Sequence, residues 1–244
     1  MPNQIFDAAS VAAYLHMEPP QINLLVKRGE IPYESRGSRV VFRRSEIDAW
    51  ASQRILGLPS NRLTAYHATS SAKMHNLSKH HALMPELTRP VFISVELTSR
   101  TKPSLIRDMK TLADKTGLVS NPDDLLTSLQ EREALCSTAI SDGIALLHPR
   151  HHEPYMFDDS FVVLGRTIQP LPFGAADGQK TDLFFLICCQ DDRIHLHVLA
   201  RVCMMCRQTK LIATLRQAES ADAMHNALLA AEQEIIKPQP ATRI

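Results

Sequence analysis

The residue with the clearest potential for chemistry is His148, which follows a short apolar segment expected to form a strand over residues 143–146. Residues at the carboxyl edge of such a strand face the clefts of open α/β sheets. A neutral imidazole is a good nucleophile near pH 7. Phosphoryl transfer needs little beyond an in-line nucleophile and positive charge for the phosphoryl oxygens, which Arg132 could supply. These residues indicate a phosphate-accepting histidine, although a single histidine after a strand is, taken alone, more often structural.

The segment before His148 resembles the active-site region of enzyme IIA of the sugar phosphotransferase system, type 2. This is the fructose, mannitol and nitrogen-regulatory class. The family motif is Arg-Glu, then Ser-Thr, then Gly-Ile-Ala-Ile-Pro-His. Here it reads Arg132-Glu133, Ser137-Thr138 and Gly143-Ile144-Ala145-Leu146-Leu147-His148. The chain departs from the motif at Leu147, where the family has the proline that fixes the backbone carrying the imidazole; here a proline follows instead, at Pro149.

The resemblance extends from about residue 89 to about residue 236. Asp177-Gly178 and the apolar run at 183–187 resemble the family's next core strand, and His195-Leu196 resembles its second active-site histidine. This implies catalytic roles for His148, Arg132 and His195, in which Arg132 and His195 assist the transfer and His195 orients the imidazole of His148. It implies no bound cofactor, since the phosphoryl group comes from a histidine phosphocarrier resembling HPr, in a chain that begins at phosphoenolpyruvate.

A second group of functional candidates lies near the N-terminus. Between residues 27 and 44 there are six basic side chains against two acidic ones, Glu30 and Glu34. A helix followed by a basic hairpin can insert the helix into the major groove and place the hairpin on phosphates. The candidate DNA-binding residues are Gln21, Asn23 and Lys27, which could read base edges, with Arg28, Arg36, Arg39, Arg43 and Arg44. A solvated basic face explains the charge alone equally well.

The order of elements favours the DNA-binding interpretation. Residues 6–50 resemble the winged helix-turn-helix of the excisionase and MerR type through three runs: Ser10-Val11-Ala12-Ala13-Tyr14-Leu15, Val26-Lys27-Arg28-Gly29-Glu30-Ile31-Pro32 and Arg43-Arg44-Ser45-Glu46-Ile47-Asp48-Ala49-Trp50. Glu18-Pro19-Pro20 stands where this family often has small polar residues. The resemblance implies that DNA is a partner of residues 1–56.

The elements that must position these residues form two patterns. In the first, Asp7 can cap a helix, Pro19-Pro20 can open a second that stops at Gly29, residues 33–44 form a hairpin, and Ser45 can cap a third helix ending at Ala51. Residues 57–88 have weak periodicity and are expected to be a linker with room for a short helix.

The second pattern begins at residue 89, where strands expected at 91–95, 143–146, 161–165 and 183–188 alternate with helices. We therefore predict an α/β protein with a winged helix-turn-helix domain (1–56), a linker (57–88) and an enzyme IIA domain (89–240), which is an α/β sandwich with a mixed sheet flanked by helices.

Composition limits the other classes of function. The net charge of +1 confines nucleic-acid binding to a local patch. The densest apolar run, 183–189, is too short to cross a bilayer, and five cysteines suggest reduced thiols, so we expect a soluble, cytoplasmic protein without membrane insertion. No Gly-rich loop indicates direct use of ATP. Metal sites built from His195, His197, Cys203 and Cys206, or from the histidines at 148, 151 and 152, are weaker interpretations, because the first set falls on a predicted helix that cysteines and methionines would pack.

Three functions follow from this organisation. The first is a regulatory phosphohistidine protein whose phosphorylation is coupled to DNA binding. The second is a non-catalytic regulator whose enzyme IIA-like domain only docks partner proteins. The third is a sugar-transport enzyme IIA that feeds an enzyme IIB, which the DNA-binding-like module disfavours.

Overall fold

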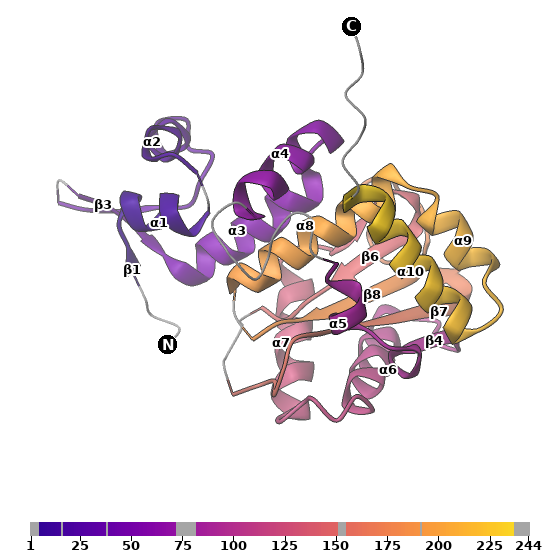
Figure 1. Ribbon diagram of the computed structural model, residues 1–244. Helices are drawn as coiled ribbons and strands as arrows, with labels where there is room; N and C mark the ends of the chain where they lie inside the picture. The colour runs from indigo at the N-terminus through magenta and orange to yellow at the C-terminus, as the bar shows by residue number, and fades with distance from the viewer. Residues whose placement is uncertain are drawn as a thin grey trace, which may run out of the picture.

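A computed structural model describes residues 5–15, 17–37, 39–71, 82–150, 155–190 and 192–236 of the chain (Figure 1). The N-terminal module contains β1 (Ile5–Phe6), α1 (Ala8–Tyr14), α2 (Pro19–Lys27), β2 (Glu34–Arg36), β3 (Arg39–Arg43) and α3 (Arg44–Gly57). Its strands form an antiparallel sheet in the order β1-β3-β2. Asp7 caps α1 by accepting a hydrogen bond from the Ser10 amide at 2.7 Å, and Pro19 opens α2, as predicted.

Helix α3 is longer than predicted. It begins at Arg44, after Arg43 as its N-cap, so the prediction that Ser45 caps it is wrong, and it continues past Ala51 to Gly57. The added turns carry Ile55 and Leu56, which are buried in a cluster shared with α8 (Asp192–Gln208). Tertiary packing therefore extends the helix beyond the point that local sequence signals indicate.

The predicted linker contains helices that pack on the C-terminal domain. Helix α4 (Ser60–Ser71) lies against α8, with Leu63 and His67 buried, and α5 (Met84–Leu87) follows. Residues 72–81 of this segment lie outside the described residues. Part of the segment 57–88 therefore belongs to the folded C-terminal domain, because α4 packs along α8, as Figure 1 shows.

The C-terminal domain is built on a mixed five-stranded sheet in the order β4-β7-β8-β6-β5. The strands are β4 (Ile93–Leu97), β5 (Ala139–Ile140), β6 (Ile144–Leu147), β7 (Phe161–Leu171) and β8 (Thr181–Cys188). The pairs β4–β7 and β6–β8 are parallel, whereas β7–β8 and β5–β6 are antiparallel. The strand expected at 91–95 starts only at Ile93, because residues 90–92 form a short 3₁₀ helix that Pro90 opens.

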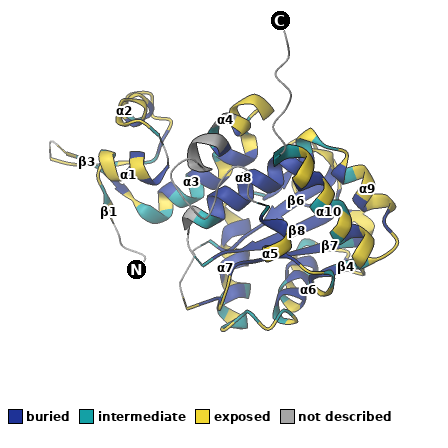
Figure 2. Cartoon of the chain, in the orientation of Figure 1, coloured by how far each residue is buried: buried dark blue, intermediate teal, exposed yellow. Residues whose placement is uncertain are grey.

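Helices cover both faces of this sheet, as predicted (Figure 2). Helices α6 (Lys102–Asp114) and α7 (Pro122–Leu135) cover one face, and α8, α9 (Leu211–Gln217) and α10 (Ala221–Ile236) cover the other. In β8, Phe184 packs on the face covered by α6 and α7, and Phe185 packs on the face covered by α8, α9 and α10. Successive side chains of a strand point to opposite faces of the sheet. None of the helices in the described ranges is long and apolar enough to cross a membrane.

The N-terminal module and the C-terminal domain share one hydrophobic cluster. Buried residues of α1, α2 and α3 belong to the same cluster as those of α4, α8 and α10. Arg207 of α8 donates to the Leu56 carbonyl at 2.6 Å and to the Leu58 carbonyl, which fixes the end of α3. The two parts therefore form a continuous core along α8.

Candidate active site

Parallel pairing of β6 with β8 brings the predicted histidines together. His148 follows β6 directly, and the chain leaves β8 at the same edge of the sheet to enter α8, whose first turn carries His195. The two rings lie 4.7 Å apart between centroids at an interplanar angle of 40°. Their side chains are buried, with exposed fractions of 2% for His148 and 1% for His195.

Arg132, from the last turn of α7, completes the predicted triad. Its Nε donates a hydrogen bond to His148 Nε2 at 2.9 Å, and its Nη1 donates to the Cys136 carbonyl at 3.0 Å. The third nitrogen, Nη2, is buried and has no hydrogen-bond partner among the described residues, and no described carboxylate forms an ion pair with Arg132. A buried cation without a counter-charge is costly, so this guanidinium is suited to receive an anion.

The hydrogen bonds of His148 define which ring nitrogen can react. Nδ1 lies 2.9 Å from the Leu146 carbonyl, which can only accept, so Nδ1 carries the proton. Nε2 then holds the lone pair and accepts from Arg132. The Leu146 carbonyl thus orients the imidazole, while Leu147, in place of the family's proline, continues β6 opposite Leu186.

Glu133, the neighbour of Arg132, has a structural role. Its carboxylate accepts hydrogen bonds from the Thr138 amide and hydroxyl and from Lys102 Nζ, the last two at 2.7 and 2.8 Å. These bonds fix the turn between α7 and β5. The Arg-Glu pair of the motif therefore separates into one residue that faces the histidine and one that holds the backbone.

Gly143 of the motif sits at a close approach between strands and α9. Its φ is +77°, and a Cβ there would lie 2.5 Å from Arg216 Nη2 and 3.0 Å from Asp182 Oδ1. Arg216 forms an ion pair with Asp182 at 2.7 Å and donates to the Asp142 carbonyl at 2.6 Å. Because glycine has no Cβ, this position leaves room for the ion pair between Arg216 and Asp182 beside the start of β6.

One residue near the histidines was not predicted. Ser52 Oγ, from α3 of the N-terminal module, lies 3.3 Å from His195 Nε2, and Ser52 is itself buried. The two residues are 143 positions apart, and a serine in a helix carries no sequence signal that would connect it with this site. The site thus includes a residue from each part of the chain.

A second buried polar group lies further along α8. His67 of α4 stacks on His197 at 4.4 Å between centroids and accepts from Arg201 Nε at 3.0 Å. Arg201 pairs with Glu232 of α10 at 2.9 Å. Burial, with the nearby His197 and Arg201, lowers the pKa of His67 to about 2, so His67 is neutral.

The alternative metal sites gain no support from the geometry. Among the described residues, no three histidine, cysteine or acidic side chains come together as metal ligands. Cys203 and Cys206 are buried in α8, and burial raises the pKa of the Cys203 thiol to about 12 and also raises the pKa of the Cys206 thiol. Residues 151 and 152 of the other proposed set lie outside the described part of the chain.

The DNA-binding candidates on α2 are all exposed: Gln21, Asn23, Lys27 and Arg28. Gln21 Oε1 accepts from the Glu18 amide at 3.0 Å and thereby caps α2. This leaves the amide nitrogen of Gln21 for a contact. Lys27 and Arg28 form no ion pair with another described residue.

The basic residues of the hairpin differ in how far they are neutralised. Glu34 pairs with Arg43 and, at 3.3 Å, with Arg36, and the hydrogen bond from Arg43 is the main reason that the pKa of Glu34 is lowered. Arg44 lies 4.0 Å from Asp48 of the same helix and 5.9 Å from the Tyr14 ring centroid. Arg39 is exposed.

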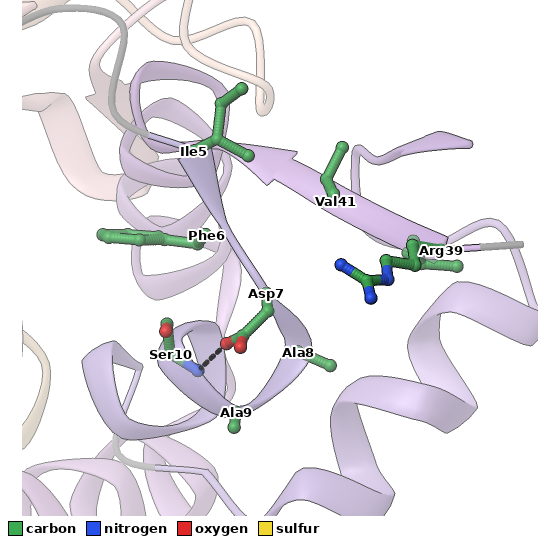
Figure 3. Close-up of a pocket in the computed structure, with 9 residues that line it drawn as sticks. Ile5, Phe6, Asp7, Ala8, Ala9, Ser10, Arg39 and Val41 are labelled. Atoms are coloured by element: carbon green, nitrogen blue, oxygen red, sulfur yellow. Dashed lines mark hydrogen bonds between the residues drawn. The ribbon is translucent and has the colours of Figure 1, made fainter. Parts of the chain in front are cut away.

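Two hollows lie in or beside the N-terminal module. One of about 580 Å³ runs between the start of α1 and β3, and Figure 3 shows Arg39 and Asp7 on opposite sides of it. The other, of about 160 Å³, lies where α1, α3 and α4 meet and is lined by Trp50, Arg54 and Tyr66 among others. Neither hollow is lined by His148 or His195.

Comparison with family models divides the chain as the structure does. Residues 86–231 match the model described as "Phosphoenolpyruvate-dependent sugar phosphotransferase system, EIIA 2", and residues 5–55 match that of a helix-turn-helix domain. The N-terminal module is therefore a helix-turn-helix domain, in agreement with the prediction.

Individual relatives match the C-terminal part. The fructose-specific EIIABC component of the phosphotransferase system of Bacillus subtilis is 27% identical over 57% of this chain, which spans only 22% of that protein. A nitrogen regulatory protein of Bradyrhizobium diazoefficiens is 27% identical over 59% of this chain and 92% of its own length.

Solved structures share the fold. The nitrogen regulatory protein IIA-Ntr of Neisseria meningitidis aligns with a TM-score of 0.54 and 24% identity over 60% of this chain and 99% of its own. The mannitol IIA of Escherichia coli aligns with a TM-score of 0.51 and 20% identity over 58% and 98% of the two chains.

Proposed function

The chain belongs to the EIIA 2 family of the phosphoenolpyruvate-dependent sugar phosphotransferase system, and from that membership we propose a regulatory function. His148 accepts a phosphoryl group from a histidine phosphocarrier resembling HPr. The phosphorylation state then controls DNA binding through residues 1–56. The observation that carries this proposal is the lone pair of His148 Nε2 directed at the buried guanidinium of Arg132.

The transfer needs no net proton movement. The Nε2 lone pair forms a bond to phosphorus while the bond between phosphorus and the donor's ring nitrogen breaks, and that electron pair returns to the donor imidazole. The proton on His148 Nδ1 stays in its hydrogen bond with the Leu146 carbonyl. Catalysis then consists of positioning and charge stabilisation.

Arg132 and His195 are the groups that would stabilise the charge. Arg132 Nε must leave Nε2 when phosphorus arrives, and the guanidinium can then donate from Nε and Nη2 to phosphoryl oxygens. His195 stands beside the acceptor ring, in the first turn of α8, where the helix dipole also favours an anion.

The test is phosphorylation of the full-length protein by phosphoenolpyruvate with purified enzyme I and HPr, followed by intact mass. We expect the mass of one phosphoryl group to be added, and the addition to be lost in His148→Ala. His225→Ala is a matched control, because His225 is a partly exposed histidine on α10 that contacts the Thr88 carbonyl. No addition to the wild type, or equal addition to His148→Ala, would contradict the proposal.

A second candidate function is non-catalytic docking, in which the EIIA domain binds partners and His148 never carries phosphate. The observation that favours it is the burial of the two histidines, exposed by 2% and 1%. The phosphorylation experiment separates this function from the first.

Sugar transport is a third candidate. The mannitol enzyme IIA of Escherichia coli, which shares this fold, has been solved in complex with phosphorylated enzyme IIB. The helix-turn-helix domain favours regulation over transport. Loss of the phosphoryl group from the labelled protein on addition of a purified enzyme IIB would indicate a transport role.

A further inference from the structure

A helix from the other part of the chain contacts the candidate site at His195. Ser52 of α3 contacts His195 Nε2, and Ser52, His148 and His195 are each exposed by 3% or less. We infer that α3 and an external phosphoryl donor compete for one face of the EIIA domain, so that the DNA-binding module is the cover of the site. This inference rests on the proposed function, because it names the regulation of that same site.

Access is the first reason. In-line transfer between two proteins requires the donor nitrogen, phosphorus and His148 Nε2 to lie on one line within bonding reach. A ring that is 2% exposed offers no path for a second imidazole. The donor can reach Nε2 only when part of the cover has moved.

Space is the second reason. Arg132 Nε stands 2.9 Å from His148 Nε2, a hydrogen-bond distance that leaves no room for a phosphorus atom and its three oxygens. The phosphorylated site must therefore expand, and the group also adds about 1.5 to 2 negative charges. The covered and the phosphorylated states thus oppose each other, and by linkage whatever favours one disfavours the other.

The contacts of α3 indicate which part moves. α4 is held to α8 by the buried hydrogen bond from Arg201 to His67, and Arg201 is itself paired with Glu232 of α10. α3 meets the site through Ser52, and its C-terminal end is bonded to α8 through Arg207, which donates to the Leu56 and Leu58 carbonyls. Movement of α3 off the site has to release these bonds as well, with the chain turning at residues 57–59, while α4 remains in place.

The helix-turn-helix domain moves with α3. Trp50 Nε1 of α3 donates to the Glu30 carbonyl at 2.6 Å, and Asp48 of α3 accepts from the Tyr14 hydroxyl at 2.5 Å. Ile47 is fully buried in the core that includes Val11 and Ile22. Release of α3 from the site thus repositions the whole DNA-binding surface as one body.

The test measures exposure of His148 without relying on phosphorylation. Diethyl pyrocarbonate modifies accessible neutral imidazoles, and the tryptic peptide 133–150 contains His148 as its sole histidine. In Ser52→Ala, which removes the hydrogen bond to His195, we expect modification of this peptide to be about tenfold faster than in the wild type. Ser52→Leu, which overfills a buried position, should accelerate it further. Gln53→Ala, an exposed neighbour on the same helix, should leave the rate unchanged.

The phosphorylation rate by enzyme I and HPr is measured on the same variants and should rise in the same order. If His148 in the wild type reacts as fast as in both Ser52 variants, the cover does not exist and the inference is overturned. If the variants expose His148 but none is phosphorylated, the cover stands and the proposed function fails. Should Ser52→Leu not fold, Ser52→Ala alone decides, because it deletes one oxygen atom and keeps the helix.

Discussion

Arg132 Nε donates a hydrogen bond of 2.9 Å to His148 Nε2, the ring nitrogen that the Leu146 carbonyl leaves unprotonated. The bond joins a nucleophile to a cation that forms no ion pair with a carboxylate in the described part of the chain. The nitrogen that would bind phosphorus and the group that would stabilise its oxygens are therefore already in contact, one from the end of β6 and one from the last turn of α7.

Arg132→Gln should slow phosphorylation of His148 by about 100-fold or more, the cost of losing one preorganised donor to a transition-state oxygen. Arg132→Lys should recover only part of the rate, because a lysine keeps the charge but not the planar fork. The measurement is the initial rate of phosphate addition by intact mass, with Arg107→Gln, an exposed arginine on α6, as the control. A rate in Arg132→Gln equal to that of the control would remove Arg132 from the site.

The sequence could predict three residues that the structure brings together, but not the serine of α3 that contacts one of them. Arg132 and His148 lie on one continuous motif of the sequence, and His195 lies on a separate pair with Leu196 after the apolar run at 183–187. Ser52 could not be predicted, since its contact joins positions 143 apart. The segment that contains α4 is expected to be a linker because its sequence has weak periodicity; among the described side chains of α4, Leu63 and His67 are the buried ones.

Glu232→Gln should lower the free energy of unfolding by about 3–5 kcal/mol, because it leaves the cation of Arg201 buried without its partner. The same carboxylate also accepts from the Leu83 and Met84 amides at 2.9 and 2.8 Å, so its loss weakens the attachment of α5. Urea unfolding gives the change. Glu234→Gln, two residues on and exposed, should be near neutral, and an equally small effect at Glu232 would show that the buried pair contributes little.

The stability of the protein should fall in acid partly through His67. Its pKa is about 2 in the folded protein, lowered first by burial and then by His197 and Arg201, against 6.5 as the ordinary value. The neutral ring is therefore favoured by folding, and this contribution is complete above the ordinary pKa and is lost as the pH falls below it. The loss approaches about 1.4 kcal/mol per pH unit for one proton.

His67→Gln keeps an acceptor for Arg201 and cannot titrate, so its unfolding free energy should depend less steeply on pH between about pH 6 and pH 4. The measurement is urea unfolding of both proteins across this range. Parallel curves for wild type and variant would show that His67 does not titrate on unfolding.

DNA binding should be limited by Glu34, which pairs with both Arg36 and Arg43 in the hairpin. Each arginine that is freed to bind a phosphate adds about one unit to the slope of log affinity against log salt. Glu34→Gln should therefore strengthen binding and steepen that slope, whereas Lys27→Ala should weaken binding and flatten it.

Glu30→Gln is the control for this prediction. It removes the same charge from a residue that has no ion pair with a described side chain, so the difference between the two glutamate variants isolates the release of the arginines. Fluorescence anisotropy with genomic DNA fragments over a series of salt concentrations gives the slopes. Equal slopes for Glu34→Gln and Glu30→Gln would mean that the hairpin arginines do not contact phosphate, and recognition would then depend on α2 alone.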